Sequence, residues 1–150
     1  MTIGLICNRD TVIARRDDAI STVARLMRVH HVGSVVVVED APEGIKPVGI
    51  VTDRDLVVEI LAAEVDAQTV TAGDVMTHEL VSAREHDGIW VTLKRMRNQG
   101  IRRLPVVDDR GVLIGLVSAD DLLDLLAGEL TDLVRLTGRE REREILKRNG

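Results

Sequence analysis

Two short motifs join a hydroxyl residue to a carboxylate three positions later. Gly49-x-x-Thr52-x-x-Asp55 in the first half of the chain is echoed by Gly115-x-x-Ser118-x-x-Asp121 in the second half. A Ser or Thr followed by an acidic residue at this spacing is typical of a helix capping box. The same hydroxyl at a helix N-terminus also suits a phosphate, and the carboxylate one turn later suits the diol of a ribose. The motifs therefore leave two interpretations open, a helix start and a nucleotide site.

Two adjacent arginines are the only charges at an otherwise apolar strand start. They are Arg102 and Arg103, within Gly100–Val106. Successive side chains on a strand point to opposite faces, so one arginine faces solvent and the other faces the interior. A cation facing the interior needs an anion to neutralise it. The matching positions in the first half are Gly33 and Ser34, so two equivalent clefts are excluded.

The motifs stand at matching positions of an internal repeat. Val32–Asp40 matches Ile101–Asp109 at an offset of 69, and Gly49–Val57 matches Gly115–Leu123 at an offset of 66. Such a repeat predicts two copies of one supersecondary unit. A unit of about 60 residues is only marginally stable alone, so we expect the copies to share a core.

Each copy is predicted to follow the order β-α-β-β-α. Ile20, Val23 and Met27 recur at helical spacing and predict a helix over 18–30, with Asp17 and Asp18 in its first turn. In the second copy Ile89, Leu93 and Met96 repeat this spacing and predict the equivalent helix. The other expected helices are 53–63 and 119–128, and the expected strands are 11–14, 34–38, 47–52, 80–83, 103–107 and 112–117. We expect domain boundaries of 1–65 and 66–128, followed by a helical tail over 129–150.

The tail has no counterpart in the first copy. Leucines continue an apolar stripe beyond Leu122, and residues 139–144 then alternate Arg and Glu. One interpretation is an exposed helix stabilised by spaced ion pairs. The other is a dimerisation helix that uses the apolar residues Leu130, Leu133, Leu136, Ile145 and Leu146.

Composition excludes several classes of protein. A net charge of −5 and a single aromatic residue, Trp90, argue against a nucleic-acid partner. One cysteine, Cys7, excludes an internal disulfide and indicates a reducing compartment. No apolar run reaches membrane length, and the N-terminus lacks a signal-peptide pattern. Since recognised catalytic motifs are also missing, we expect a non-enzymatic, cytoplasmic protein with no membrane partner.

The histidines and Cys7 raise a metal-binding alternative. A metal needs several converging ligands, whereas the adjacent His30 and His31 are expected to point apart at the end of a helix. Cys7 aligns with Met76 in the repeat, which favours a small buried apolar side chain.

The repeat resembles a tandem pair of CBS domains, regulatory modules named after cystathionine β-synthase. The resemblance rests on Val32–Val37 with Gly49–Asp55 and on Gly100–Val106 with Gly115–Asp121, and it covers about residues 3–127. It implies an α/β (α+β) fold in which two β-α-β-β-α repeats pack through their sheets with pseudo-two-fold symmetry. It also implies two clefts, which in many members bind adenosine-containing ligands.

The resemblance also implies roles for individual residues. In this family the Ser or Thr of the motif contacts phosphate, its Asp holds the ribose hydroxyls, and basic residues at the strand start contact phosphate. Adenine lies against aliphatic side chains and backbone of the neighbouring strands. Carried over, the candidate ligand-binding residues are Thr52, Asp55, Ser118, Asp121, Arg102, Arg103, Val12, Ala14, Ser34, Val81, Ala83 and Pro105.

The two clefts are expected to differ in strength. Because Gly33 and Ser34 carry no charge, we expect the cleft of Ser118 and Asp121 to bind nucleotide more tightly, and Asp121→Ala to cost more affinity than Asp55→Ala. The cleft of the first motif is expected either to bind weakly or to borrow a basic residue from the other copy.

The leading functional hypothesis is a non-catalytic sensor. It needs no obligatory cofactor, binds AMP, ADP or ATP as a regulatory ligand, forms a homodimer and signals to an unidentified effector protein. One alternative is a ligand-free interaction or dimerisation module that regulates a partner. The other is a metal-binding stress protein.

Overall fold

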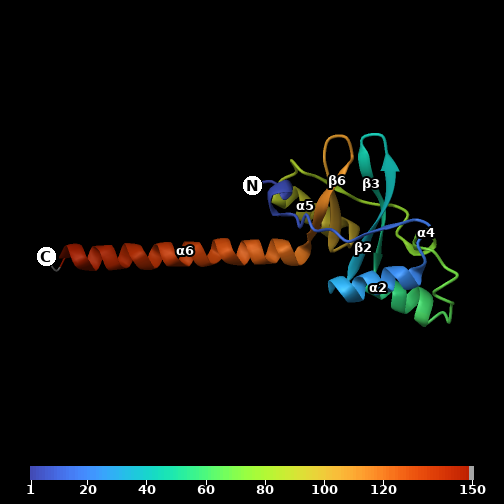
Figure 1. Cartoon of the computed structure of the whole chain (residues 1–150). Coiled ribbons are helices and arrows are strands. Elements are labelled where there is room, and N and C mark those ends of the chain that lie inside the picture. The colour runs from blue at the N-terminus through green and yellow to red at the C-terminus, as the bar shows by residue number, and fades with distance from the viewer. Residues whose placement is uncertain (149–150) are drawn as a thin grey trace.

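The computed structural model describes residues 1–148 as two three-stranded sheets with flanking helices and one long C-terminal helix (Figure 1). The first repeat contains α1 (Ile3–Ile6), β1 (Ile13–Arg15), α2 (Ile20–His30), β2 (Ser34–Ala41), β3 (Gly44–Thr52), α3 (Asp53–Asp55) and the π-helix η1 (Leu56–Leu61). The second contains α4 (Ala72–Val75), β4 (Ala83–Arg84), α5 (Ile89–Gln99), β5 (Arg103–Val107), β6 (Leu113–Ser118) and α6 (Ala119–Arg148).

Both sheets have the same topology and the same irregularity. β2 pairs in parallel with β1 and antiparallel with β3, and β5 pairs in the same way with β4 and β6. The register shifts at Val37/Val38 in the first sheet and at Val106/Val107 in the second, which are repeat-equivalent positions. The predicted repeat and its β-α-β-β-α order are therefore confirmed.

The two repeats share a core between their sheets. On β2, Val35 and Val37 face the helices of their own repeat, whereas Val36 and Val38 face the second sheet and lie near Leu116 of β6. All four valines are at most 1% exposed. Because both faces of β2 are buried, its sequence is an unbroken run of apolar residues, whereas a strand with one exposed face would alternate apolar and polar residues. The expected shared core is confirmed.

The opening helix of each repeat packs on the other repeat. Ile3 of α1 lies in the core of the second repeat, and Ala72 of α4 lies in the core of the first. Backbone hydrogen bonds fix both crossings: Gly4 N–H donates to the Glu85 carbonyl at 2.9 Å, and Gly73 N–H donates to the Arg16 carbonyl at 2.8 Å. The two repeats are thus interlocked at their N-terminal segments.

The predicted acidic first turn of α2 is wrong. The helix starts at Ile20 after the N-cap Ala19, and its first turn has no acidic residue. Asp18 instead accepts a hydrogen bond from the Arg15 N–H at 2.7 Å, which closes the turn before the helix. The repeat-equivalent Asp87 does the same for the Arg84 N–H at 3.0 Å.

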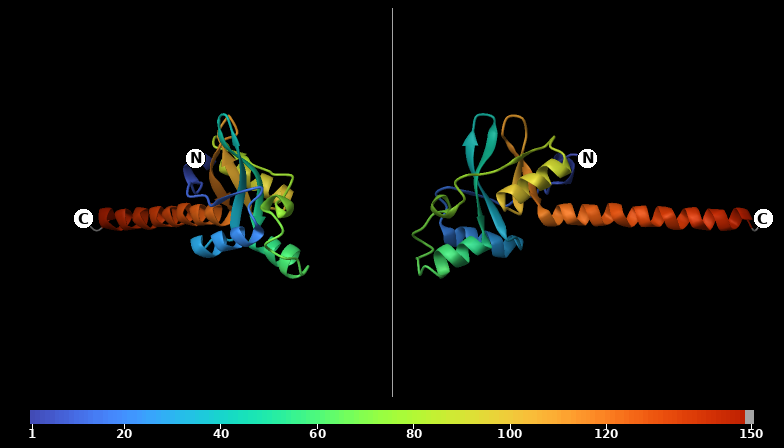
Figure 2. Two further views of the ribbon diagram at one scale, coloured as in Figure 1. Left: turned by 45° about the vertical axis from the view of Figure 1, so that its right-hand side comes forward. Right: turned by 180° about the vertical axis from the view of Figure 1, so that it is seen from behind.

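The predicted helix over 119–128 ends too early, because α6 continues to Arg148 without a break. Gly128 looks like a C-terminal stop signal in the sequence, yet the helix runs through it. Both views in Figure 2 show α6 projecting away from the two sheets. The last two residues of the predicted tail, 149–150, lie outside the described residues.

Candidate functional site

Both hydroxyl–carboxylate motifs form complete capping boxes. Thr52 N–H donates to Asp55 Oδ2 at 2.8 Å, and Asp55 N–H donates back to Thr52 Oγ1 at 3.2 Å. Ser118 N–H donates to Asp121 Oδ2 at 2.7 Å, and Asp121 N–H donates to Ser118 Oγ at 3.1 Å. The helix-start interpretation is confirmed at both motifs. In each carboxylate the described hydrogen bonds use only Oδ2.

A third capping box shows that this pattern alone does not mark a ligand site. Thr71 and Asp74 start α4 with the same two backbone hydrogen bonds, at 3.0 and 3.3 Å. Donation from the Thr71 backbone N–H and hydroxyl lowers the pKa of Asp74 below its ordinary value. This box was missed in the sequence, although the Thr-x-x-Asp spacing is plain there. A ligand site therefore has to be argued from what surrounds each box.

A cavity of about 490 Å³ opens beside the first motif. It is lined by Ile50 and residues 52–54 at the end of β3, and by residues 77, 79–81 and 99–103 of the second repeat. Its volume falls within the range of small-molecule sites. Asp55 is not among the lining residues and stands behind Thr52 in the capping box.

The crossing of the repeats builds this cavity. Thr77 N–H donates to the Ile50 carbonyl at 3.0 Å, which holds the opening segment of the second repeat against β3 of the first. At the equivalent place, Asn8 N–H donates to the Leu116 carbonyl at 2.8 Å. Each motif thus faces the opening segment of the other repeat, and a molecule in the cavity touches both repeats.

The motif glycines permit this close approach. A Cβ on Gly49 would lie 2.8 Å from the Cβ of Met76, and a Cβ on Gly115 would lie 2.6 Å from the backbone oxygen of Asn8. Real Cβ contacts are essentially never under 3.0 Å, so a side chain at either position pushes the crossing segment away. The first residue of each motif therefore serves the architecture rather than the ligand.

Arg103 points its guanidinium at the first motif. Its backbone pairs with Ser118 in the β5–β6 register, yet a Cβ built on Gly33 would lie 3.6 Å from Arg103 Nη2 and 3.0 Å from Asp53 Oδ2. Within residues 1–148 no carboxylate oxygen lies within 4.0 Å of this guanidinium. Arg103 is thus a partly buried cation that lines the cavity without an ion-pair partner.

This position corrects the grouping expected from the sequence. Arg103 was assigned to the cleft of Ser118 and Asp121 in its own repeat, but its side chain lies at the Thr52 cavity. The physical reason is the missing side chain at Gly33, which leaves room for a guanidinium from the other repeat. The alternative that the first motif borrows a basic residue from the other copy describes the observed arrangement.

Arg102 is the solvent-facing member of the pair, as the strand alternation predicted. Its side chain is 70% exposed, and Nη2 lies 2.9 Å from Asp120 Oδ1. This exposed ion pair already neutralises part of its charge, so Arg102 is a weaker anion ligand than Arg103 although both line the cavity.

Few of the expected adenine contacts reach the cavity. Val81 lines it. Ala14 and Ala83, 3% and 0% exposed, instead face the helices in the cores of their own repeats, and Val12 packs against the first of these cores. Ser34 and Pro105 are buried within β2 and β5. Lining residues that the sequence did not nominate include Asp53, Arg54, Glu79 and Leu80.

The structure does not assemble a metal site from the nominated residues. Cys7 packs in the second core, where burial raises the pKa of its thiol. His30 and His31 are exposed at the end of α2, and His31 takes the left-handed conformation of a C-cap. Across residues 1–148, no three His, Cys, Asp or Glu side chains gather as metal ligands would.

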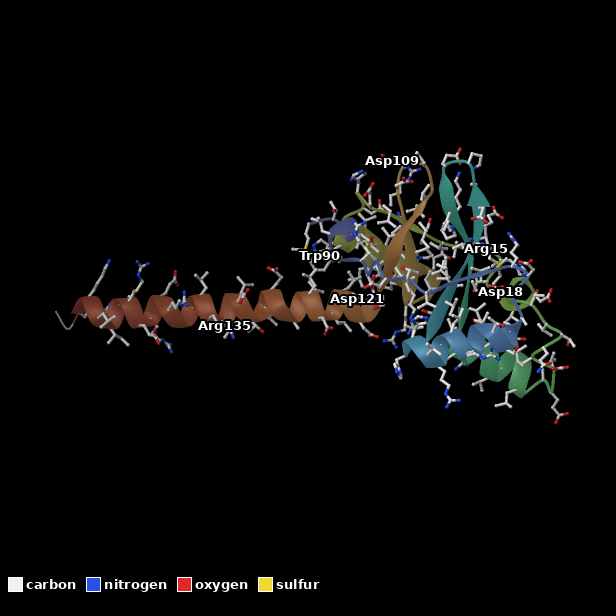
Figure 3. All side chains as sticks on the ribbon, viewed as in Figure 1. Arg15, Asp18, Trp90, Asp109, Asp121 and Arg135 are labelled. Atoms are coloured by element: carbon white, nitrogen blue, oxygen red, sulfur yellow. The ribbon has the colours of Figure 1, made fainter. Side chains whose placement is uncertain are left out.

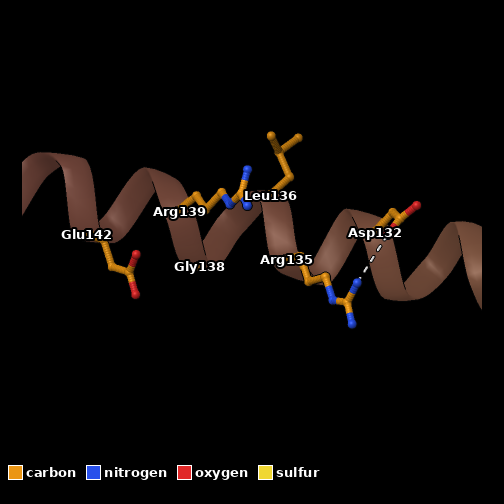
Figure 4. A pocket seen from close by; sticks show the side chains of 6 residues that line it. All are labelled: Asp132, Arg135, Leu136, Gly138, Arg139 and Glu142. Atoms are coloured by element: carbon orange, nitrogen blue, oxygen red, sulfur yellow. Dashed lines mark ion pairs between the residues drawn. The ribbon is translucent and has the colours of Figure 1, made fainter.

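A second hollow lies on α6, bordered by residues between Asp132 and Glu142 (Figure 4). Because all its lining residues belong to one helix, no second element encloses a ligand there. No helix within residues 1–148 has the length and hydropathy needed to span a membrane.

A family model described as the CBS domain matches residues 3–62 and 72–128, one match for each repeat. The chain belongs to the CBS domain family. The second match ends at residue 128, so most of α6 lies beyond the residues that the family model matches. CBS domain pairs are generally regulatory modules.

Curated relatives agree with this assignment. An uncharacterized protein of Methanopyrus kandleri is 35% identical over 125 residues, which cover 83% of this chain and 62% of that protein. The CBS domain-containing protein YhcV of Bacillus subtilis is 37% identical over 106 residues, which cover 71% of each chain. The chain thus spans less than two thirds of the length of the Methanopyrus relative.

A solved structure has the same fold. The CBS domain pair of the protein MJ0100, in complex with 5′-methylthioadenosine and S-adenosyl-L-methionine, superposes with a TM-score of 0.73 at 24% identity. The match covers 86% of this chain and 98% of that one. This likeness shows the fold, and the ligands named are those of MJ0100.

Proposed function

We propose that this protein is a non-catalytic sensor that binds an adenosine-containing nucleotide in the cavity beside Thr52 and signals its occupancy to a partner protein. The observation that carries the proposal is Arg103, a partly buried guanidinium that lines this cavity and has no described ion-pair partner. A cation placed in this way favours an anionic ligand, because the carboxylate of Asp53 beside Gly33 lies beyond ion-pair distance and neutralises the guanidinium only in part.

The lining supports a nucleotide in one orientation. Thr52, Arg103 and Arg54 form the polar end, next to the carboxylate of Asp53, and the two guanidinium groups suit a phosphate. Ile50, Leu80, Val81 and Ile101 form an apolar end that suits a purine ring without aromatic stacking. In this orientation the ribose lies between the two ends. Asp55 does not line the cavity, and it acts on the ligand only by holding Thr52 in the capping box.

Occupancy is coupled to conformation because the cavity is shared by the repeats. A ligand that touches Thr52 of the first repeat and Arg103 of the second favours the relative orientation in which both contacts form. Such a ligand shifts the population of states only by its difference in affinity for them. The partner is then expected to read the orientation of the repeats.

The ligand class is AMP, ADP or ATP, or another molecule that shares their adenosine. The adenosine compounds bound by the CBS pair of MJ0100 support this class. We further propose that the sensor is a homodimer. A cytoplasmic location stays a prediction from the cysteine content.

A ligand-free interaction module is the second candidate, and one observation favours it. Both capping boxes satisfy their own backbone groups without any ligand, so Thr52, Asp55, Ser118 and Asp121 have a structural role in any case. Under this alternative, Arg103 pairs with a carboxylate of a protein partner.

Calorimetric titration distinguishes the two candidates. Nucleotide-stripped protein is titrated with AMP, ADP, ATP, NAD and S-adenosylmethionine, and the titration is repeated on Arg103→Met and Arg102→Met. A hydrogen bond to a charged group is worth roughly 1.5–3 kcal/mol, so Arg103→Met is expected to weaken binding by about 10- to 100-fold. Arg102→Met, the matched control, is expected to weaken it by less than about threefold, because this side chain is exposed and already paired. No heat with any ligand, from folded protein, favours the interaction module.

A further inference from the structure

Most of α6 lies outside the folded body. Every residue from Ala127 to Arg148 is exposed, and Figures 1 and 3 show this part of the helix projecting from the sheets. It also contains Gly128 and Gly138, whose high conformational entropy disfavours a helix. Helices in proteins owe most of their stability to packing of an apolar face, so a helix of this kind is expected to have a partner.

An apolar seam runs along the projecting helix. Leu123, Leu126, Leu130, Leu133 and Thr137 follow each other at spacings of 3, 4, 3 and 4 residues, the spacing of a coiled-coil seam. Leu123, Leu130 and Leu133 are 62%, 64% and 60% exposed. Leu122, by contrast, is buried and anchors α6 to the second repeat.

Charge is divided between the two halves of α6. Residues 119–132 contain five acidic side chains and no basic one, whereas residues 135–148 contain six basic and three acidic side chains. The helix dipole favours this polarity, but its effect fades within the first and last turns. Asp124, Glu129 and Asp132 lie beyond the first turn, so the dipole does not account for them.

We propose that α6 pairs with α6 of a second copy of this chain in antiparallel orientation. The leucine seams then cover each other, and the acidic half of each helix faces the basic half of the other, in which Arg141 borders the seam. Parallel pairing covers the same seam but places acidic half against acidic half, which costs repulsion. The pairing is centred between Thr131 and Asp132, with Leu126 of one copy opposite Thr137 of the other and Leu130 opposite Leu133.

This seam narrows the set of residues that the sequence nominated. Leu130 and Leu133 lie on it, and Ile145 borders its continuation. Leu136 and Leu146 lie off the seam. Leu136 is one residue from Thr137, about 100° around the helix, and Leu146 is nine residues from Thr137, about 180° around the helix. The inference supplies a surface for the homodimer proposed above and holds whether or not the cavity binds nucleotide.

The mass of the full-length chain in solution tests the pairing. Light scattering at micromolar concentration is expected to show the mass halved in the double variant Leu130→Glu/Leu133→Glu relative to the unaltered chain. Leu146→Glu, the matched control on the opposite face of the helix, is expected to leave the mass unchanged. A monomeric unaltered chain, or an unchanged mass in the seam variant, overturns the proposal.

Disulfide trapping tests the orientation. When a chain with Leu126→Cys is mixed with a chain carrying Thr137→Cys and oxidised, the antiparallel arrangement is expected to give mainly the mixed disulfide, and Thr137→Cys alone is expected to give little. Native Cys7 is a poor competitor, because it is buried and its burial raises the thiol pKa. Efficient trapping of Thr137→Cys with itself contradicts the antiparallel proposal. Neither experiment uses a nucleotide, so its failure is distinguishable from failure of the sensor proposal.

Discussion

The two motif sites are alike in backbone and unlike in charge. Each pairs a capping box with the opening segment of the other repeat, through the equivalent bonds from Thr77 to Ile50 and from Asn8 to Leu116. Where the second repeat supplies Arg102 and Arg103, however, the first supplies Gly33 and Ser34. A duplicated scaffold thus preserves the geometry of a site, while single substitutions decide whether that site attracts an anion.

The largest expected effect concerns the crossing that makes both sites. Gly115→Ala drives a Cβ to 2.6 Å from the backbone oxygen of Asn8, and this oxygen cannot move without disturbing the pairing with Leu116. Overpacking of this kind typically costs about 1–3 kcal/mol, and we expect the upper end here. Gly49→Ala meets Met76, whose sulfur can move aside but whose Cβ, at 2.8 Å, moves only with the backbone. Because the nearest fixed atom is farther away than the oxygen at 2.6 Å, Gly49→Ala is expected to cost less. Urea denaturation measures both values, and a larger loss for Gly49→Ala contradicts this ranking.

A smaller difference in stability is expected between substitutions in the turns that precede α2 and α5. Asp87 and Asp18 close equivalent turns, but only Asp87 also has an arginine, Arg95 Nη1 at 2.7 Å. Burial raises the pKa of Asp87, yet hydrogen bonds from the Arg84 N–H and from Arg95 outweigh it, so the net pKa is lowered. The ion pair is about one quarter exposed, and we expect Asp87→Asn to cost about 1 kcal/mol more than Asp18→Asn at neutral pH.

The pH dependence of that difference follows from the direction of the shift. A carboxyl whose pKa is lowered on folding stabilises the fold above its unfolded value, near 3.9, and loses this contribution as the pH falls through the folded value. The excess cost of Asp87→Asn is therefore expected to be constant at neutral pH and to shrink below about pH 4. Denaturation series at several pH values check this, and an excess that persists in acid contradicts the assignment to the charged form.

Local patterns predicted the repeat, the order of its elements and the capping boxes of the two motifs, because each depends on residues close together in the chain; the box of Thr71 and Asp74 was missed. The crossing of α1 and α4 was out of reach, since two four-residue helices carry no periodicity that names their partner repeat. Strand alternation predicted that Arg102 and Arg103 face opposite ways. It did not predict which repeat receives the guanidinium of Arg103, because that depends on the space left at Gly33 across the interface.

The central claim is that the Thr52 site, rather than its counterpart at Ser118, binds the nucleotide. Thr52→Ala and Ser118→Ala form a matched pair, since each removes one capping hydroxyl and each is expected to cost about 1 kcal/mol of stability. In calorimetric titration with AMP and ATP, Thr52→Ala is expected to weaken binding by about tenfold, from loss of about 1.4 kcal/mol, while Ser118→Ala leaves affinity unchanged. Equal losses in the two variants, or a larger loss in Ser118→Ala, would contradict the assignment of the site.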